Sequence, residues 1–179
     1  HDYGPNDSDR SFRDKDLSLE TFKLFWGNPT YGIEDGRGIT TSFERDDCQF
    51  FLLDNRYFRT RQGKHCFLGA QQMAWLKQTL RACKGPFIIM SCGTMWSDYV
   101  SNGKDSWGKY DPEGREEIFS LIEKEKVPGV LLVSGDRHGA RGFRIPRPSG
   151  FEFHEFEPAS LGGRSGPPAT NEAWTTQLY

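Results

Sequence analysis

Hydrophobic residues follow their most regular pattern between residues 48 and 134. Two apolar runs, 86–91 and 130–134, contain no charged residue and are typical of strands buried on both faces of a sheet. A third short run, 48–53, ends at the carboxylate of Asp54. We therefore expect three strands here, with 86–91 and 130–134 as neighbours in one sheet.

An amphipathic segment separates each pair of runs, and both segments place their apolar residues on one helical face. The second segment starts at Asp111-Pro112, a favourable N-cap followed by a favourable first residue. The apolar stripes consist of Met73, Leu76, Leu80 and Cys83 in the first helix and Ile118, Phe119 and Ile122 in the second. The resulting β-α-β-α-β order predicts an α/β fold with mostly parallel neighbouring strands and right-handed crossovers.

The flanking segments are less regular. Ser18 is expected to cap a short helix that ends near Trp26, and 39–44 is a candidate strand. Phe and polar residues alternate over 151–156, which predicts a half-exposed strand. The tail, 162–179, is rich in Gly and Pro and is expected to be extended.

Composition narrows the class of protein. The chain has 179 residues, a net charge of −2 and a mean hydropathy of −0.70, so it suits one globular domain without a surface for nucleic acid or anionic membranes. No apolar run approaches the roughly 20 residues that a membrane span needs. The four cysteines form no C-x-x-C pair, which argues against a zinc ribbon, while a disulfide at Cys66 stays open.

The clearest candidate chemistry is the stretch S134-G-D-R-H-G139. Asp136 and His138 follow a buried strand and are two residues apart, so their side chains can point the same way and bind a divalent or trivalent metal ion. Ligands of open parallel sheets bind beyond the carboxyl ends of the strands, where this stretch lies. The alternative is that Asp136 caps a turn and His138 pairs with a surface carboxylate.

The N-terminal stretch H1-D-Y-G-P-N-D7 is a second candidate. His1 can act as a general acid, and Asp2, Asn6 and Asp7 can offer oxygen ligands to a metal. The alternative is an Asx-rich turn around Gly4-Pro5.

Three further groups are open to two interpretations. The arginines of D54-N-R-Y-F-R59 can hold a phosphate, or one of them can pair with Asp54. Trp96, Trp107 and nearby tyrosines can form the wall of a pocket or part of the core. His65 and His154 are expected to be ordinary surface residues.

Several segments together resemble the PhoD-like (alkaline phosphatase D) metallophosphatases, relatives of the calcineurin-like phosphoesterases. The matching pieces are H1-D-Y-G-P-N-D7, F50-F-L-L-D-N-R-Y-F-R59, L68-G-A-Q-Q-M-A-W-L76 and G129-V-L-L-V-S-G-D-R-H138. D-S-W107 and H154-E-F156 are compatible with it. The resemblance extends from His1 to about Leu161.

The resemblance implies a metal-dependent phosphoric ester hydrolase, either a phosphomonoesterase or a phosphodiesterase. Asp136 and His138 take two metal-ligand positions, Asn6 is a further candidate ligand, and His1 takes the place of the catalytic histidine. Arg56 and Arg137 are the candidate phosphate-binding residues. Two or more metal ions are expected: Fe³⁺ and Ca²⁺ by resemblance, with Zn²⁺ or Mn²⁺ as alternatives.

Two earlier metal motifs of the family, including a G-D-x-x-Y-x-D-like segment, do not occur in this sequence. We therefore expect residues 1–179 to form the C-terminal half of a four-layer α-β-β-α sandwich, with a mixed sheet. The expected partner is the missing N-terminal half, without which the chain is inactive. The resemblance also favours a periplasmic or extracellular location.

A different class of function fits the strand order equally well. A non-catalytic α/β binding module for a phosphorylated or nucleotide ligand has the same β-α-β-α-β core. The two hypotheses differ at Asp136 and His138, because only the enzyme needs both residues on a metal ion.

Overall fold

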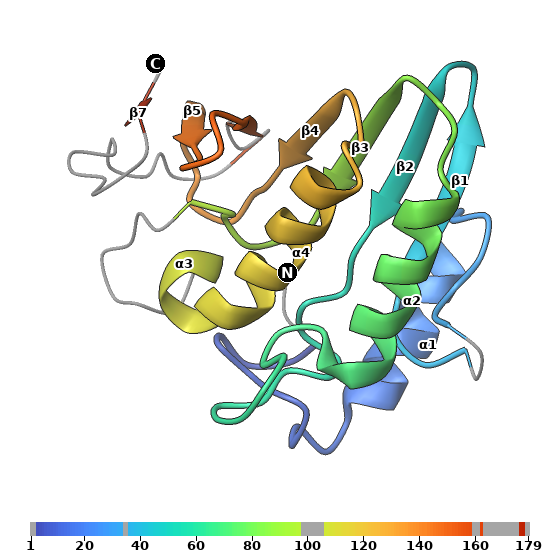
Figure 1. The fold of residues 1–179 in the computed structure, drawn as a ribbon. Coiled ribbons are helices and arrows are strands. Elements are labelled where there is room, and N and C mark those ends of the chain that lie inside the picture. Colours follow the sequence, from blue (N-terminus) through green and yellow to red (C-terminus); the bar gives the residue numbers. More distant parts are fainter. Residues whose placement is uncertain (1–2, 34–35, 98–105, 159–161, 163–175, 178–179) are drawn as a thin grey trace.

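The computed structural model describes residues 3–33, 36–97, 106–158, 162 and 176–177 (Figure 1). One mixed sheet of seven strands forms its centre, in the order β1-β2-β3-β4-β6-β5-β7. The strands are β1 (Thr41–Arg45), β2 (Cys48–Leu52), β3 (Phe87–Ser91), β4 (Val130–Val133), β5 (Arg141–Pro146), β6 (Glu152–Glu157) and β7 (Thr176–Gln177). The helices are α1 (Lys15–Phe25), α2 (Gly69–Ala82), α3 (Trp107–Tyr110) and α4 (Pro112–Lys124).

The predicted β-α-β-α-β core is confirmed as β2-α2-β3-α4-β4. Strands β2, β3, β4 and β6 are parallel, while β1, β5 and β7 pair antiparallel at the edges. β3 and β4 are neighbours, with Ile88 opposite Val130 and Ser91 opposite Val133. The carboxyl ends of four strands therefore meet at one edge of the sheet.

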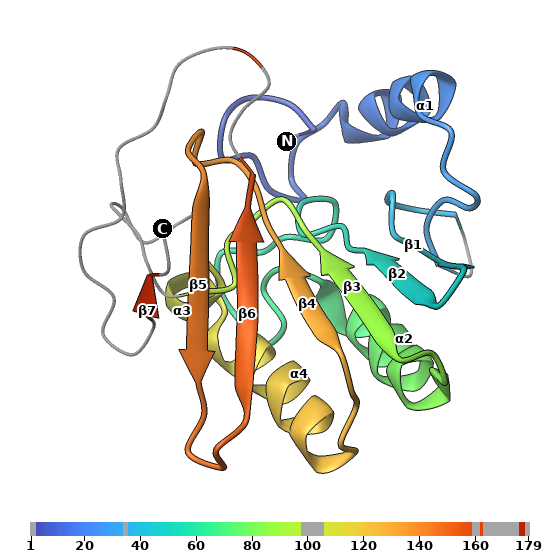
Figure 2. The same ribbon diagram turned by 90° about the horizontal axis from the view of Figure 1, so that it is seen from above.

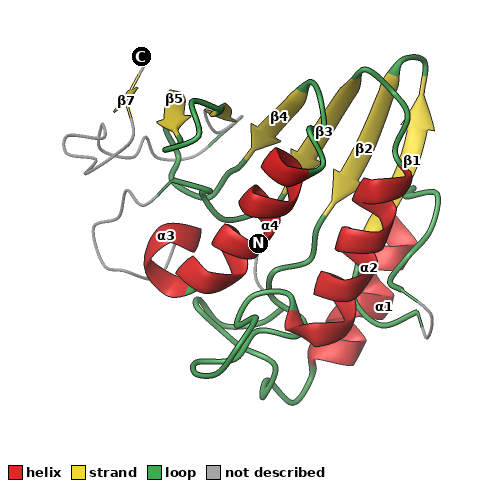
Figure 3. Ribbon diagram, viewed as in Figure 1, coloured by secondary structure: helices red, strands yellow, loops and turns green. Residues whose placement is uncertain are grey.

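Helices α2 and α4 cover one face of the sheet because both have one continuous apolar stripe (Figure 3). The side chain of Asp111 caps α4 by accepting from the N–H of Gly114 at 3.1 Å, as predicted. Phe119 of α4 stacks on Phe153 of β6 with ring centroids 4.0 Å apart.

The aromatic residues after β3 belong to the core. Trp96 and Trp107 are fully buried and stack with ring centroids 4.9 Å apart. Tyr110 stacks in turn on Phe67 at 4.8 Å. The core interpretation is therefore correct for Trp96, Trp107 and Tyr110, whereas Tyr99 lies outside the described residues.

The expectation that 86–91 and 130–134 are buried on both faces is wrong. In β3, Ile88 and Met90 are fully buried, but Ile89 is only half-buried and Phe87 is 54 % exposed. The described helices α2, α3 and α4 all lie on one side of the sheet, so the other side has no covering layer in the described part of the chain (Figure 2). The apolar residues of the open face include Phe43, Phe50, Leu52, Phe87, Ile89, Leu131, Val133 and Phe156.

Other expectations also need correction. α1 begins at Lys15, and the Ser18 hydroxyl, far from capping the helix, donates to the carbonyl of Tyr3 at 2.5 Å. β5 was not predicted. In β6, Phe153, Glu155 and Glu157 are buried, and the residues between them are less buried. The pairing of β6 with β5 fixes the register that turns the two glutamates toward the core.

The structure also answers the open questions about the cysteines and part of the tail. All four cysteines lie in the described residues and are free thiols. Of the tail 162–179, only Gly162 and β7 are described, and β7 pairs with β5. No helix among the described residues is long and apolar enough to cross a membrane.

Candidate functional site

Main-chain hydrogen bonds align the loops that leave the carboxyl edge of the sheet. The N–H of Leu53 donates to Ser91 at 2.8 Å, and the N–H of Cys92 donates to Val133 at 3.1 Å. Ser134 continues the ladder to Phe156 at 3.1 Å. The loops after β2, β3 and β4 therefore emerge side by side, which is where ligands of open α/β sheets bind.

The turn after β4 contains both predicted metal ligands. Asp136 has φ 80° and His138 has φ 60°, a left-handed conformation that is uncommon for residues with a side chain. His138 is exposed and Asp136 is half-buried. Such backbone conformations cost about 1–3 kcal/mol each and cluster at functional sites. The structure thus brings a carboxylate and an imidazole into one turn, as the sequence predicted.

The buried carboxylate of Glu155 joins the loops after β3 and β4. It accepts from the N–H groups of Trp96 and Ser97, both at 2.8 Å, and from the hydroxyl of Ser134 at 2.6 Å. Burial raises the pKa of Glu155 to about 7 against the effect of these donors. The sequence analysis did not predict a role for Glu155. The two-residue spacing of Phe153, Glu155 and Glu157 could have indicated that all three face the same side of one strand.

The N-terminal segment lies against the loop that follows β2 (Figure 2). The hydroxyl of Tyr3 donates to the carboxylate of Asp54 at 2.5 Å, and the N–H of Arg10 donates to the carbonyl of Arg59 at 2.9 Å. Asn6 is exposed in a turn, and His1 lies outside the described residues. The structure therefore brings the N-terminal candidate stretch to the 54–59 stretch.

Asp54 organises this contact. Besides Tyr3, its carboxylate accepts from the main-chain N–H groups of Ile39, Arg56 and Tyr57, each at 2.9 Å. Burial raises the pKa of Asp54, while the hydrogen bonds from Tyr3 and the main chain act in the opposite direction. These hydrogen bonds to the Asp54 carboxylate hold the loop after β2 in place.

The candidate phosphate-binding arginines are less accessible than expected. Arg56 is 4 % exposed, and Arg137 is half-buried. Arg59 is buried against two aromatic rings, with its guanidinium carbon 4.1 Å from the ring centroid of Tyr110 and 5.3 Å from that of Phe67. Arg59 therefore packs as part of the core, whereas Arg56 and Arg137 remain predictions.

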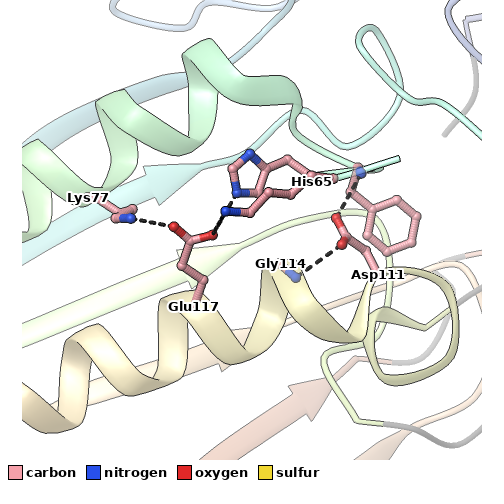
Figure 4. A network of polar contacts seen from close by, with 7 residues as sticks. His65, Lys77, Asp111, Gly114 and Glu117 are labelled. Carbon is pink, nitrogen blue, oxygen red and sulfur yellow. Dashed lines mark hydrogen bonds and ion pairs between the residues drawn. The ribbon is translucent and has the colours of Figure 1, made fainter. Parts of the chain in front are cut away.

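His65 lies away from the sheet edge, on the helix layer (Figure 4). Its Nε2 atom is 2.6 Å from the carboxylate of Glu117, which is also 2.5 Å from Lys77. The hydrogen bonds from Lys77 and His65 lower the pKa of Glu117 to about 2. His65 is thus an ion-paired residue that links α2, α4 and the loop between β2 and α2.

A cavity of about 480 Å³ opens beside the carboxyl ends of β2, β3 and β4. Leu53, Cys92 and Gly135 mark the three strand ends, and Phe22 and Trp26 of the α1 region form another part of its wall. Its volume is in the range of small-molecule sites. The cavity places space for a ligand directly next to the turn that contains Asp136 and His138.

The donor chemistry of the turn after β4 fits a metal ion, because carboxylate and imidazole groups bind Zn²⁺, Mn²⁺ and iron. Two donors are too few for a metal site. Within the described ranges, no group of three or more His, Cys, Asp or Glu residues is placed to hold a metal. Burial raises the pKa of the nearby Cys92 thiol to about 12, so it is protonated at neutral pH. Asp136 and His138 are therefore two donors of suitable chemistry, and their role as metal ligands stays a prediction.

Comparisons with known proteins agree with this geometry. The profile of the PhoD-like phosphatase family matches residues 35–177. A solved structure of PhoD aligns with a TM-score of 0.65 and 17 % identity, covering 87 % of this chain and 37 % of that one. The purple acid phosphatase PPD1 from yellow lupin (Lupinus luteus) aligns with a TM-score of 0.62 and 16 % identity, covering 97 % of this chain and 33 % of that one.

These similarities show the fold, and the chain spans about a third of the length of the two solved structures. They agree with the expected part of an α-β-β-α metallophosphatase sandwich. A comparison with curated protein sequences found no match.

Proposed function

Because the chain belongs to the PhoD-like phosphatase family, we propose that it forms part of a metal-dependent hydrolase of phosphate esters. The observation that carries the proposal is the strained turn after β4. It presents Asp136 and His138 at the carboxyl edge of the sheet, next to a cavity. Family membership supports a phosphatase function. The turn after β4 offers two side chains, Asp136 and His138, of the types that bind catalytic metal ions.

In this proposal, Asp136 and His138 bind metal, with Asn6 as a further oxygen donor. The metal ions would act as Lewis acids on a phosphoryl oxygen and lower the pKa of water. His1 would protonate the leaving alkoxide, and Arg56 and Arg137 would contact phosphate oxygens. At least two ions are proposed: Fe³⁺ and Ca²⁺ by family resemblance, or Zn²⁺ or Mn²⁺.

We further propose that activity requires a second half of the sandwich. Three observations support this: the chain spans about a third of the solved phosphatases, one face of the sheet is apolar and open, and the turn after β4 offers two metal donors. Metal sites usually take four to six ligands, so the remaining donors would come from the other half.

Two finer points rest on resemblance alone. A periplasmic or extracellular location is proposed because much of the family is exported. Phosphate monoesters and diesters are both proposed substrates, because variable loops form the substrate pocket.

The first test is the metal content of the His138→Ala variant of the full enzyme, in which residues 1–179 are combined with the proposed second half. We expect it to lose about one metal ion per protein while its thermal melting temperature stays unchanged, because His138 is exposed in a turn. His154→Ala on β6 is the matched control and should retain all metal. Full metal content in His138→Ala would remove His138 from the ligand set.

If the wild-type protein bound no metal at all, the binding-module hypothesis would replace the enzyme hypothesis.

The second test measures hydrolysis of an aryl phosphate monoester and of its diester. Residues 1–179 alone should be inactive, and addition of the second half should restore turnover. Equal turnover by the chain alone would contradict the need for a second half.

A further inference from the structure

A buried ion pair lies directly beneath the turn that contains Asp136 and His138. Arg141 begins β5, Glu157 ends β6, and the two residues face each other across the antiparallel ladder. The Nη1 atom of Arg141 is 2.7 Å from Oε2 of Glu157, and the side chains are 1 % and 0 % exposed. Both charges are therefore fully removed from water.

The same two side chains hold the main chain of the turn. Glu157 uses its other oxygen, Oε1, to accept from the N–H of Arg137 at 2.7 Å. Nη1 of Arg141 lies 3.4 Å from the carbonyl of Arg137 and 3.3 Å from that of Gly139. The pair thus contacts the backbone both between the two candidate ligands and directly after His138.

Close packing accompanies these bonds. A Cβ atom added at Gly139 would lie 3.1 Å from Nη1 of Arg141, so any other residue here would require the guanidinium to move by a few tenths of an ångström. The guanidinium therefore fills the space under the turn as well as bonding to it.

The turn needs such support because its backbone is strained. Asp136 and His138 both have positive φ, which persists only where the surroundings determine the conformation. A buried ion pair is a poor source of stability, since apolar residues of similar volume often serve as well. Its contacts with the turn give the pair a specific task that apolar residues cannot perform.

We propose that Glu157 and Arg141 are positioning residues that hold the turn after β4 in the conformation that directs Asp136 and His138 at one metal ion. This inference rests on the proposed function for the metal and adds to it the residues on which the geometry of the site depends. Partners that orient metal ligands typically change metal affinity by about 10–100-fold when they are removed.

The test compares metal affinity in variants of residues 1–179 combined with the proposed second half, by competition with a chelator, using Mn²⁺ and Zn²⁺. Glu157→Gln should weaken metal binding by about 10–100-fold. Arg144 and Glu152 provide the matched control, because they pair at 3.6 Å across the same two strands but are 44 % and 40 % exposed. Glu152→Gln should bind metal like the wild type. An affinity for Glu157→Gln within twofold of the control would overturn the proposal.

Two further variants separate positioning from folding. The double variant Glu157→Leu/Arg141→Met replaces the whole pair by apolar residues, so it should fold while losing every bond to the turn. Weak metal binding by this folded variant supports positioning, and wild-type affinity overturns it. Arg141→Lys keeps the charge but lacks the guanidinium fork, so it should lie between the wild type and the double variant.

Amide hydrogen exchange reports on the turn without any metal. Exchange at Arg137 should accelerate at least tenfold in the double variant relative to Glu152→Gln, because its N–H loses the Glu157 acceptor. Unchanged exchange would overturn the proposal. If the wild type bound neither metal while exchange still accelerated, the proposed metal function would fail, and so would the role of the pair as its positioning residues.

Discussion

The two faces of the sheet differ although the same strands form both. On the helix-covered face, Ile88, Met90 and Leu132 are fully buried against α2 and α4. On the open face, Ile89, Leu131 and Val133 are equally apolar but only half-buried. Equal hydrophobicity along a strand is therefore compatible with unequal burial of its two faces, and the described chain buries only one of them.

The helix-covered face contributes most of the stability of this chain, because burial of apolar area is worth roughly 25 cal/mol per Å². The open face contributes less here and is available for association, since large exposed apolar patches mark interaction sites.

The largest expected effect comes from two neighbouring residues of β3 that point to opposite faces. Met90→Ala should lower the free energy of unfolding of residues 1–179 by about 2–5 kcal/mol, as is usual for a fully buried side chain. Ile89→Ala should cost about 1 kcal/mol, because less of its area leaves water on folding. Urea unfolding monitored by tryptophan fluorescence measures both values.

Equal losses for the two variants would show that the open face is buried in solution, for instance by self-association. A sharper form of the comparison adds the proposed second half. The loss caused by Ile89→Ala should then approach that of Met90→Ala.

A smaller effect is expected where the helix layer is joined to the loop after β2. The carboxylate of Asp111 accepts from the N–H groups of Gly114 and Phe67, both at 3.1 Å (Figure 4). Asp111→Ala should cost about 2 kcal/mol, because a helix cap and a buried acceptor are lost together.

Asp111→Asn is the control for this prediction. Asparagine is an equally good N-cap but has only one acceptor oxygen, so thermal or urea unfolding should give a loss of about half that of Asp111→Ala. Identical losses for both variants would assign the whole effect to the contact with Phe67.

The sequence was sufficient for the elements whose causes are local. The stripe of α2 and the Asp111-Pro112 start of α4 depend on spacing and capping, and both were predicted with nearly correct bounds. The pairing of β3 with β4 followed from the apolar character of both runs and the one helix predicted between them, to which the structure adds the short α3. Asp136 and His138 were proposed as metal ligands because they directly follow a predicted strand, and this role stays a prediction.

Features that depend on tertiary contacts were not predictable in this way. The burial of Glu157 depends on Arg141, a residue of a strand that the pattern did not reveal. The start of α1 was misplaced because the hydroxyl of Ser18 bonds to Tyr3. The open face was not predicted, because the sequence of an apolar strand does not reveal whether the residues that cover it are part of the same chain.

The smallest effect is expected at Glu117, on the outer side of the helix layer. Lys77 and His65 bond to its carboxylate, which is 26 % exposed, so water still screens the charges. Glu117→Gln should therefore cost about 0.2–1 kcal/mol at pH 7, as measured by urea unfolding.

The lowered pKa of Glu117 predicts how the stability difference between wild type and Glu117→Gln changes with pH. The pKa of Glu117 is lowered from 4.5 to about 2 in the folded protein, mainly by hydrogen bonds from Lys77 and His65. A depressed carboxyl pKa contributes stability that is complete above the unfolded value and is lost as the pH falls through the folded one. The difference between wild type and Glu117→Gln should thus be constant above about pH 5 and vanish near pH 2. A difference that persisted at pH 2 would assign the effect to packing of the side chain and not to its charge.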